Sequence, residues 1–259
     1  MALIGIDLGT TNSLACICKD GKIILIPNQM GTYQTPSVVS LTENGLVVGD
    51  MAKNNIILSP ENTATSFKTF MGTDKVYHLG EQSFLPEELS ALVLKQLVAD
   101  AEKFLHEPVT EAIISVPAYF NDSQRCATKL AAEIAGISVE RLINEPSAAA
   151  LYHQFASDKK DGCMMVIDFG GGTLDVSIVE CFENIVEIIG IAGDNHLGGN
   201  DIDFEIANFF CKQNKISFEQ LRQEEKAILY QQAEQAKITL SSKNYTTMIL
   251  FVQDIEYRL

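Results

Sequence analysis

Two similar stretches of sequence decide the fold: "IGIDLGTTNS" at residues 4–13 and "VIDFGGGTLD" at residues 166–175. In each stretch a short apolar run ends on an aspartate, and glycine and threonine follow within a few residues. Asp7 and Asp168 are 161 positions apart (168 − 7), and the same interval separates Gly9 from Gly170. A single short motif of this kind often occurs by chance, but two copies in matching sequence context indicate a duplicated structural motif.

Each aspartate is expected at the tip of a buried strand, where an unpaired carboxylate is unfavourable and needs water, a cation or a hydrogen-bond donor. Glycine in the turn lets backbone N–H groups converge on a phosphate, and Thr10, Thr11 and Thr173 would add hydroxyl donors. Asp7 and Asp168, facing each other across a cleft, would hold the hydration shell of Mg²⁺. The alternative is that each turn is simply a tight hairpin with a capping aspartate.

The composition is that of a globular protein with 259 residues, enough for one large domain or two lobes. The formal net charge of −15 disfavours nucleic acid and anionic membrane surfaces as partners. No run approaches the about 18–20 apolar residues of a membrane span, and the N-terminus has no signal-peptide pattern. The six cysteines form no CxxC pair, which indicates reduced thiols. We therefore expect a cytoplasmic protein.

Hydrophobic periodicity predicts an α/β chain in which a three-stranded meander followed by helices occurs twice. Strands are expected at 2–7, 13–18, 22–26, 36–41, 111–117, 139–143, 163–168, 174–181, 185–192, 245–252 and 255–259. Helices are expected at 86–105, 122–135, from Pro146 onward, and at 199–213 and 217–240. Residues 42–85 are irregular and indicate an insertion or small subdomain. The polar "SDKKDG" at 157–162 is the best lobe boundary.

Four motifs carry a resemblance to a known family: "GIDLGTTNS", "ISVPAYFND", "INEPSAAAL" and "IDFGGGTLD". They resemble the ATPase domain of the 70-kDa heat-shock chaperones of the DnaK type, and the short region around 74–86 resembles the bacterial HscC branch. The resemblance implies the actin-like ATPase fold, with ribonuclease H-like duplicated lobes that clamp ATP. It places lobe I at 1–157 with an inserted subdomain at about 37–85. It places an incomplete lobe II at 158–259, with a hinge and outer subdomain from about 198.

The resemblance also assigns two phosphate loops. The first comprises Asp7, Gly9, Thr10, Thr11 and Asn12, and the second comprises Asp168, Gly170, Gly171, Gly172, Thr173 and Asp175. Within these loops, Asp7, Asp168 and Asp175 match residues that hold magnesium, mostly through water. The resemblance thus implies ATP or ADP and Mg²⁺ as cofactors, with K⁺ as a further candidate ion.

Two residues outside the loops complete the implied catalytic group with Asp168 and Thr173. Lys68, in "SFKTFMG", matches the family lysine that positions the attacking water and contacts the γ-phosphate. A cation there would stabilise charge that develops on the transferred phosphoryl group. Glu145 matches the family glutamate near the metal waters. From the residues alone, Lys68 reads as a solvated surface lysine and Glu145 as a first-turn helix acid.

Further residues match family positions around the loops. Pro117, Tyr119 and Arg125 match a relay between the nucleotide site and the interdomain surface, an analogy only. "AGDNHLGGND" at 192–201 resembles the hinge between lobe subdomains, with Gly198 and Gly199 as flexible points. The alternative for this stretch is a simple helix-start loop, and His196 is expected to be a packed or capping residue.

The segment "EQAKITLSS" at 234–242 resembles the helix that holds one side of the adenosine. Glu234, Lys237 and Ser241 fall on matching positions, and steps of four and three put them on one helix face. Ile238 stands where the family commonly has an arginine that stacks on adenine, which predicts weaker adenine binding. From the residues alone, a solvated charged face is an equally good interpretation.

The implied activity is ATP hydrolysis that drives lobe motion, coupled to unfolded client polypeptides through a separate C-terminal domain. The implied partners are a J-domain co-chaperone and a nucleotide exchange factor, with no nucleic acid and no membrane. The family domain continues beyond residue 259 with a glycine-rich adenosine loop, so residues 1–259 are expected to bind ATP weakly or not at all. The alternatives are a sugar or acetate kinase and a filament-forming cytoskeletal protein of the same fold.

Overall fold

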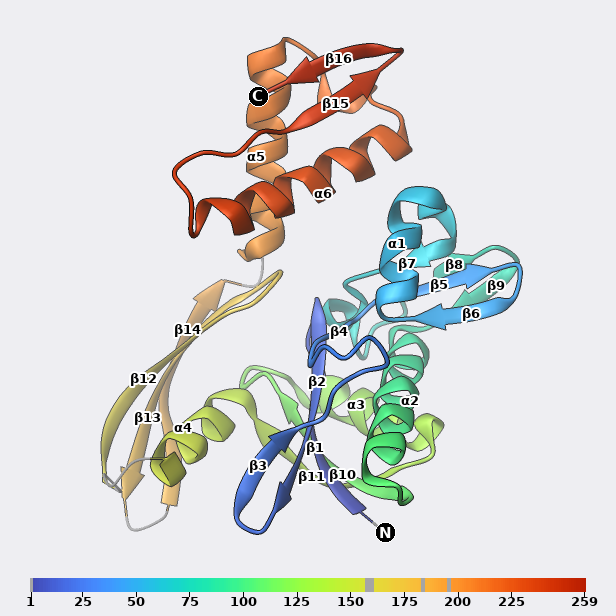
Figure 1. The fold of residues 1–259 in the computed structure, drawn as a ribbon. Helices are drawn as coiled ribbons and strands as arrows, with labels where there is room; N and C mark the ends of the chain where they lie inside the picture. The colour runs from blue at the N-terminus through green and yellow to red at the C-terminus, as the bar shows by residue number, and fades with distance from the viewer. Residues whose placement is uncertain (1, 157–160, 183–184, 195–196) are drawn as a thin grey trace.

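The computed structural model describes residues 2–156, 161–182, 185–194 and 197–259, and the statements below concern these residues. Figure 1 shows three groups of elements: a large sheet with helices beside it, a curved three-stranded sheet, and a helical unit at the C-terminal end. Each group has its own cluster of buried hydrophobic side chains.

The first group is built on a sheet with the strand order β11-β10-β1-β2-β3. β1 runs parallel to β10 and antiparallel to β2, and β10 runs parallel to β11. The strands are β1 (Ala2–Asp7), β2 (Asn12–Lys19), β3 (Lys22–Leu25), β10 (Val109–Val116) and β11 (Ser138–Asn144). Asp20 and Gly21 between β2 and β3 have φ of 51° and 72°, as expected for the tight hairpin that this dipeptide predicts.

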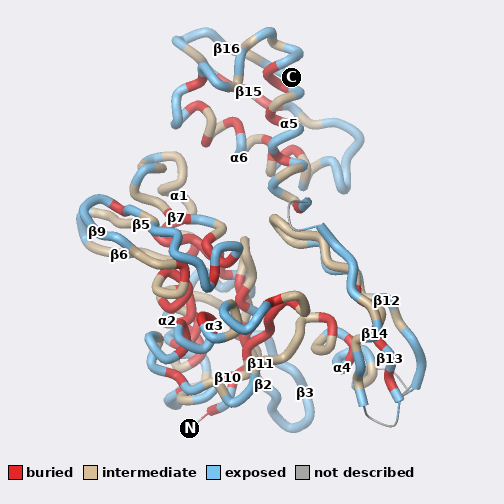
Figure 2. Tube along the Cα trace, turned by 180° about the vertical axis from the view of Figure 1, so that it is seen from behind, coloured by how far each residue is buried: buried red, intermediate tan, exposed pale blue. Residues whose placement is uncertain are grey.

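Two helices pack beside this sheet, α2 (Pro86–Leu105) and α3 (Asp122–Ala135). Asn121 caps α3 by accepting a hydrogen bond from the Gln124 N–H at 3.0 Å, and Gly136 ends it in the left-handed region, with φ 87°. Both helices begin and end where the sequence predicts. Figure 2 shows the buried residues concentrated in this group, whereas the curved sheet is mostly half-buried or exposed.

The insertion between β3 and α2 contains short strands and one helix. Its elements are β4 (Thr35–Pro36), β5 (Val39–Thr42), β6 (Gly45–Val48), α1 (Asp50–Leu58), β7 (Thr63–Ala64), β8 (Tyr77–Leu79) and β9 (Gln82–Phe84), with 3-10 turns at Pro60–Asn62 and Phe67–Phe70. The prediction of one strand over 36–41 is wrong, because β4 pairs with β2 whereas β5 pairs with β6 and β7. Ser37 separates them: its N–H donates to the Thr11 carbonyl at 2.8 Å.

The second group is an antiparallel meander of β12 (Gly162–Phe169), β13 (Leu174–Phe182) and β14 (Ile185–Asp194). Helix α4 (Glu145–Ala156) contacts all three strands, and Ala150 shares their buried cluster with Val179 and Cys181. The expected lobe boundary falls partly on residues 157–160, outside the described residues, and the division into lobes stays a prediction. The packing places the buried side of α4 with the second sheet.

The third group contains α5 (Gly199–Asn214), a 3-10 turn (Phe218–Gln220), α6 (Gln223–Leu240), β15 (Ile249–Val252) and β16 (Ile255–Arg258). The expected helix over 217–240 begins later, because Glu225 accepts a hydrogen bond from the Arg222 N–H at 2.8 Å and fixes the first turn. The expected strand over 245–252 begins at Ile249. No described helix is long and apolar enough to cross a membrane.

Candidate functional site

Two carboxylates mark the centre of the site. Asp7 ends β1, and its Oδ1 accepts a hydrogen bond from the Ser115 hydroxyl of neighbouring β10 at 2.7 Å. Asp168 lies one residue before the end of β12. Desolvation raises the pKa of Asp168 above its ordinary value and the Asp7 charge raises it further, while Lys68 opposes both. The two aspartates from the duplicated turns therefore lie within electrostatic reach of each other.

A buried ion pair stands beside these carboxylates. Lys68 Nζ lies 2.9 Å from Glu145 Oε1, with side chains only 8% and 16% exposed. The Lys68 ammonium also lies 5.8 Å from the centre of the Phe120 ring. Desolvation raises the pKa of Glu145, while Lys68 acts in the opposite direction. The interpretation of Lys68 as a solvated surface lysine is therefore wrong.

The turn after β1 is held by serine side chains. The Gly9 N–H donates to the Ser13 hydroxyl at 3.2 Å, and the Ser37 hydroxyl donates to the Gly9 carbonyl at 2.7 Å. The Ser13 and Ser37 hydroxyls lie 2.9 Å apart, so both hold the same turn. Asn12 begins β2 and pairs with Pro36 in β4. This loop is therefore fixed in place by a polar network from two neighbouring segments.

The turn after β12 meets the first turn directly. It closes with a hydrogen bond from the Gly170 N–H to the Thr173 carbonyl at 2.9 Å. A Cβ at Gly171 would overlap the Thr11 hydroxyl, whereas a Cβ at Gly172 would make an ordinary contact with Thr10, 4.0 Å from its methyl carbon. The Thr11 hydroxyl oxygen is buried and has no hydrogen-bond partner among the described residues. It is therefore available to a ligand between the loops.

The first residues of α5, with the N-cap residue Gly198, lie against the second loop. The Gly199 N–H donates to the Gly170 carbonyl at 2.9 Å, and the Asn200 N–H donates to the Gly171 carbonyl at 2.8 Å. A Cβ at Gly198 would overlap the Gly171 backbone, so glycine is required there by close approach. His196, expected to be packed or capping, lies outside the described residues. The Gly198–Gly199 pair thus connects α5 to the loop.

Lys237 connects α6 to the same segment. Its Nζ donates to the Gly199 carbonyl at 2.9 Å and to Asp203 Oδ2 at 2.8 Å. Asp203 is 7% exposed, and its other oxygen, Oδ1, is buried without a partner among the described residues. Desolvation raises the pKa of Asp203, and the hydrogen bond from Lys237 opposes this. Like the Thr11 hydroxyl, Oδ1 is an unsatisfied polar atom that a ligand would stabilise.

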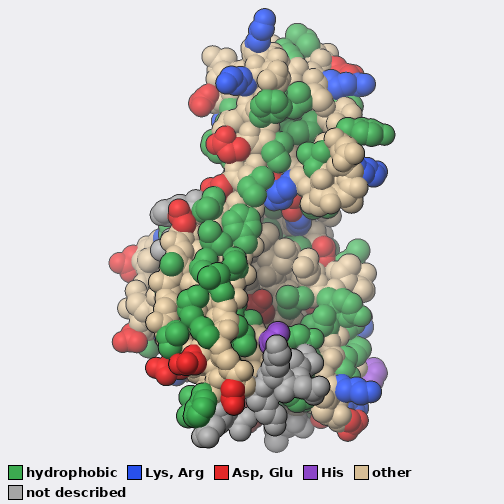
Figure 3. Space-filling model, turned by 90° about the vertical axis from the view of Figure 1, so that its left-hand side faces the viewer, with side chains coloured by type: hydrophobic (Ala, Val, Ile, Leu, Met, Phe, Trp, Pro, Cys, Tyr) green, Lys and Arg blue, Asp and Glu red, His purple; other side chains and the backbone are tan. Residues whose placement is uncertain are grey.

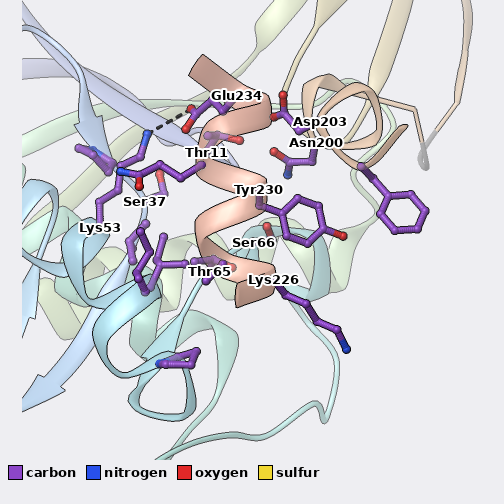
Figure 4. Close-up of a pocket in the computed structure, with 18 of the residues that line it drawn as sticks. Thr11, Ser37, Lys53, Thr65, Ser66, Asn200, Asp203, Lys226, Tyr230 and Glu234 are labelled. Atoms are coloured by element: carbon purple, nitrogen blue, oxygen red, sulfur yellow. Dashed lines mark hydrogen bonds and ion pairs between the residues drawn. The ribbon is translucent and has the colours of Figure 1, made fainter. Parts of the chain in front are cut away.

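A pocket of about 860 Å³ opens beside the loops, between α1 on one side and α5 and α6 on the other. Thr10, Thr11 and Asp203 are among its lining residues. Figure 4 shows Lys53 and Glu234 pointing toward each other across it, and their charged atoms are 3.1 Å apart. An ion pair thus joins the insertion to α6 beside the site.

Ser241 and Ile238, which were expected beside the adenosine, do not line the pocket as Glu234 does. Ser241 follows the last helical residue, is exposed, and donates to the Lys237 carbonyl at 3.3 Å. Ile238 is 55% exposed. Neither lines the pocket. Their proposed contacts with adenosine stay predictions.

Around the second loop, the Thr173 side chain lies close enough to Tyr119 and Asp175 to lower the pKa of both groups. Desolvation, with a further effect from Asp175, raises the pKa of Tyr119 to about 12. Desolvation also raises the pKa of Asp175, and Thr173 opposes that rise. Tyr119 is therefore an uncharged hydroxyl at neutral pH and contacts the second loop.

Arg125 holds the segment that carries Tyr119. Its Nε donates to the Phe120 carbonyl at 2.9 Å, and its guanidinium donates to Asn144 Oδ1 at 2.8 Å. Asn144 immediately precedes Glu145, and Phe120 contacts Lys68. Pro117 accepts a hydrogen bond from the Phe120 N–H at 3.2 Å. The three predicted relay residues are therefore connected to the buried ion pair, although no relay function is tested by these contacts.

Within the described ranges, no group of three or more His, Cys, Asp or Glu side chains could hold a metal ion directly. The role of Asp7, Asp168 and Asp175 in holding magnesium through water stays a prediction. The acidic pair Asp7 and Asp168, whose mutual repulsion raises the pKa of Asp168, fits a cation between them.

Sequence reasoning missed four residues that shape the site: Lys53, Asp203, Ser37 and Ser115. Lys53 lies in an ordinary helical sequence, and its partner Glu234 is 181 positions away. Ser37 and Ser115 are small polar residues in or beside strands, with no motif. Only the spacing of Asp203 after the glycines of "LGGNDID" offered a signal, as an acidic residue in the first turns of a helix.

The duplicated turns, the neighbouring carboxylates of Asp7 and Asp168 and the mixture of helices and sheets are those of α/β proteins with the actin-like ATPase fold. The sequence profile of the family described as "Hsp70 protein" matches residues 3–78 and 73–256. This chain belongs to the Hsp70 family.

The relatives are long chaperones. Chaperone protein DnaK of Thermotoga petrophila is 46% identical over 256 residues, which are 96% of this chain and 42% of the relative. DnaK of Thermotoga maritima gives the same values. The chaperone protein dnaK of Cyanophora paradoxa is 44% identical over 274 residues, covering 96% of this chain and 44% of the relative. The chain thus spans about two fifths of the length of these relatives, and assignment to the HscC branch stays a prediction.

Proposed function

We propose that this chain is the ATP-binding and ATP-hydrolysing part of a molecular chaperone. The observation that carries the proposal is the meeting of the two turns at Thr11 and Gly171, with the buried Lys68–Glu145 pair beside them. Glycine-bearing turns that converge on one point suit a chain of phosphates. The similarity to proteins named as chaperones supports this function over a sugar kinase or a filament protein.

The proposed division of labour follows from the contacts. The turns at Gly9–Thr11 and Gly170–Thr173 bind the phosphates, with the unsatisfied Thr11 hydroxyl as a donor. Lys68, held by Glu145 and shielded from water, presents its charge where the transferred phosphoryl group would develop negative charge. Thr173 orients the second turn through Asp175 and Tyr119.

Magnesium fits the acidic centre formed by Asp7, Asp168 and Asp175. When bound, the ion would neutralise phosphate charge. Asp7 and Asp168 would hold its water ligands, since Mg²⁺ keeps several waters and favours carboxylates. Glu145 would contact those waters; desolvation raises the pKa of Glu145, and Lys68 opposes that rise. A K⁺ ion and the HscC-like character stay parts of this proposal.

The adenosine would lie against α6. The buried Asp203 Oδ1 has no donor among the residues that the structure describes and suits a sugar hydroxyl, and Glu234 and Lys237 lie on the same side of the helix. The exposed Ile238 cannot stack as an arginine does, which supports weak binding of the base. Residues 1–259 alone are expected to bind ATP more weakly than micromolar.

In a protein as long as the relatives, ATP hydrolysis would change the relative orientation of the lobes. A peptide-binding domain would respond to that change. Unfolded polypeptide clients, a J-domain co-chaperone and a nucleotide exchange factor are the proposed partners, and the cytoplasm is the proposed compartment. The contacts of Tyr119 and Arg125 with the site support a route for this coupling.

The experiment is a titration of isotopically labelled residues 1–259 with ATP and MgCl₂ up to ~10 mM, because weak ligands still shift amide signals at that concentration. We expect shifts at Gly9–Thr11 and Gly170–Thr173, and Thr11→Ala should weaken the response. In a longer form that hydrolyses ATP, Thr173→Ala should slow hydrolysis much more than it weakens binding. Shifts absent from both turns, or equal loss of binding and hydrolysis, would contradict the proposal.

A further inference from the structure

Ser115 and Asp7 occupy directly paired positions near the ends of two parallel strands. β1 runs parallel to β10, and the register places Asp7 opposite Ser115. Residues that are directly opposite in neighbouring strands share one face of the sheet. Because the two strands run in the same direction, both side chains also lie at the edge from which the turn after β1 departs. The register alone therefore brings the Ser115 hydroxyl and the Asp7 carboxylate together.

The row of residues across the sheet at this level offers Asp7 one side-chain donor. Ser115 lies on one side of Asp7, and Leu14 of β2 lies on the other. Beyond Ser115, the row continues with Ile143 of β11. Leu14 and Ile143 have hydrocarbon side chains, so the Ser115 hydroxyl is the only donor among the side chains of these four residues.

The hydrogen bond between the two side chains makes the two oxygens of Asp7 different from each other. The Ser115 hydroxyl donates to Asp7 Oδ1 at 2.7 Å, a distance typical of a hydroxyl that donates to an ionised carboxylate. Ser115 is only 9% exposed, so water has little access to its hydroxyl. Asp7 itself is exposed, and within the described residues its Oδ2 accepts no hydrogen bond. Oδ1 is thus held by the protein, and Oδ2 is left to solvent or a ligand.

The hydrogen bond to Oδ1 limits how Asp7 can bind a divalent cation. Ca²⁺ takes about 6–8 oxygen ligands and often binds a carboxylate through both of its oxygens. Mg²⁺ is smaller, keeps several of its waters and binds through one or two carboxylates. If Asp7 bound a cation through both oxygens, the hydrogen bond from Ser115 would have to break. Binding through Oδ2 alone, directly or through a water, leaves that hydrogen bond intact.

The charges around Asp7 favour a cation at this position. Desolvation is the main cause of the raised pKa of Asp168 and of Glu145, and the Asp7 charge raises both further. The three carboxylates therefore lie within electrostatic reach of one another. Lys68 lies 2.9 Å from Glu145 and offsets one of these negative charges. The remaining excess of negative charge attracts a divalent cation, and the geometry at Asp7 affects which one binds.

We propose that Ser115 is a positioning residue that makes Asp7 favour Mg²⁺ over Ca²⁺. Its hydroxyl holds Oδ1, so Asp7 offers one oxygen to a cation and can offer both only by losing a hydrogen bond. The selection rests on the cation site proposed above for Asp7, Asp168 and Asp175, and it adds which ion that site prefers.

The strength of one hydrogen bond to a charged group sets the size of the effect. The loss of such a bond changes an equilibrium constant by about 10-fold. Ca²⁺ that binds through both oxygens of Asp7 suffers this loss in the wild type but not in Ser115→Ala. Mg²⁺ that uses Oδ2, or a water on it, does not suffer the loss in either form. Ser115→Ala should therefore raise the affinity for Ca²⁺ about 10-fold relative to the affinity for Mg²⁺.

The test is a pair of titrations of isotopically labelled residues 1–259, one with CaCl₂ and one with MgCl₂, at constant ionic strength and without nucleotide. The amide signals of Asp7 and its neighbours report binding at the site. Figure 3 shows acidic side chains spread over the face that it views, and the formal net charge is −15, so both ions also associate loosely with the surface. Because the two ions have the same charge, this background largely cancels in the ratio of their dissociation constants.

Two further variants at Ser115 separate the hydroxyl from the shape of the side chain. Ser115→Thr keeps a hydroxyl and suits a strand, so it should keep the wild-type ratio. Ser115→Val has the shape of threonine without the hydroxyl and should act like Ser115→Ala. Ser40→Ala is the matched control, because Ser40 is a fully buried serine of β5 whose hydroxyl accepts a hydrogen bond from Thr63 at 2.9 Å. It should leave the ratio unchanged, and circular dichroism checks that each variant is folded.

Three results would overturn the proposal. If the wild type binds both ions and Ser115→Ala and Ser115→Val stay within ~2-fold of its ratio, Ser115 has no part in the selection and the cation site stands. If the Asp7 signals of the wild type respond to neither ion up to ~50 mM, the cation site fails together with the selection. If Ser40→Ala shifts the ratio as much as Ser115→Ala does, the effect comes from the loss of a buried hydroxyl in general.

Discussion

The two aspartate turns have nearly the same local chemistry but very different support. The turn after β1 belongs to a sheet with a large buried cluster, and Ser13 and Ser37 hold its backbone. The turn after β12 belongs to a sheet with a small buried cluster, and the first residues of α5 donate the hydrogen bonds that hold it. Two copies of one motif are therefore not necessarily equally rigid. The second turn is held by residues of the C-terminal unit, which has a buried cluster of its own.

The largest expected effect comes from the buried ion pair between Lys68 and Glu145. Lys68→Met would leave Glu145 buried without its partner and destabilise the fold by about 2–4 kcal/mol. Since the loss of Lys68 raises the pKa of Glu145 further, the destabilisation should be largest at alkaline pH, where the unpaired carboxylate is charged, and shrink as acid protonates it. Urea unfolding followed by circular dichroism measures this.

Two companion variants control the Lys68→Met result. Adding Glu145→Gln to Lys68→Met should recover part of the lost stability by removing the buried charge. Lys53→Met breaks the more exposed pair, in which the lysine is 41% exposed, and should lose only about 0.2–1 kcal/mol. Equal losses for Lys53→Met and Lys68→Met would show that the burial of the second pair has no energetic consequence.

The next effect concerns the contact between the turns. Gly171→Ala places a Cβ against the Thr11 hydroxyl and should push the turns apart, weakening ATP binding about 10-fold or more. Gly172→Ala is the matched control, because its Cβ finds only an ordinary contact with Thr10. The titration of amide signals with ATP compares the two. A larger effect of Gly172→Ala would mean that the turns do not meet when nucleotide binds.

The smallest effect concerns the second carboxylate. The pKa of Asp168 is raised, so its carboxyl favours folding below its ordinary pKa and this contribution is lost as pH rises through the raised value. Asp168→Asn should therefore raise the melting temperature slightly at pH 7, by less than about 2 °C because the residue is exposed, and the gain should shrink as the pH is lowered. Added MgCl₂ should stabilise the wild type more than the variant; an equal gain would argue against a cation held at this carboxylate.

Local signals predicted the elements that they control. The dipeptide Asp20-Gly21 predicted a hairpin, and Asn121 and Gly136 predicted both ends of α3. The start of α6 was missed because its first turn is fixed by Glu225 behind Arg222, and arginine is not a typical capping residue. Sequence patterns thus predicted well wherever the residue that sets the boundary also carries the signal.

The sequence singled out the two loops of the candidate site but not the residues that hold those loops in place. The aspartates and glycines repeat at one interval, so they could be found without a structure. The burial of Lys68 could not, because a lone lysine in "SFKTF" gives no sign of a partner 77 positions away. Asp203 and Lys53 were missed for the same reason: long-range pairing is decided by how the units pack and leaves no local pattern.

The hydrogen bonds from Gly199 and Asn200 to the second turn make the exchange of two amide protons depend on whether the C-terminal unit and the turn are in contact. The two donors belong to the C-terminal unit and the two acceptors, Gly170 and Gly171, belong to the turn. Solvent can exchange these two amide protons only when the unit and the turn separate. Their deuterium exchange rates therefore measure the frequency of that separation directly, at two positions in the chain and without any label or ligand.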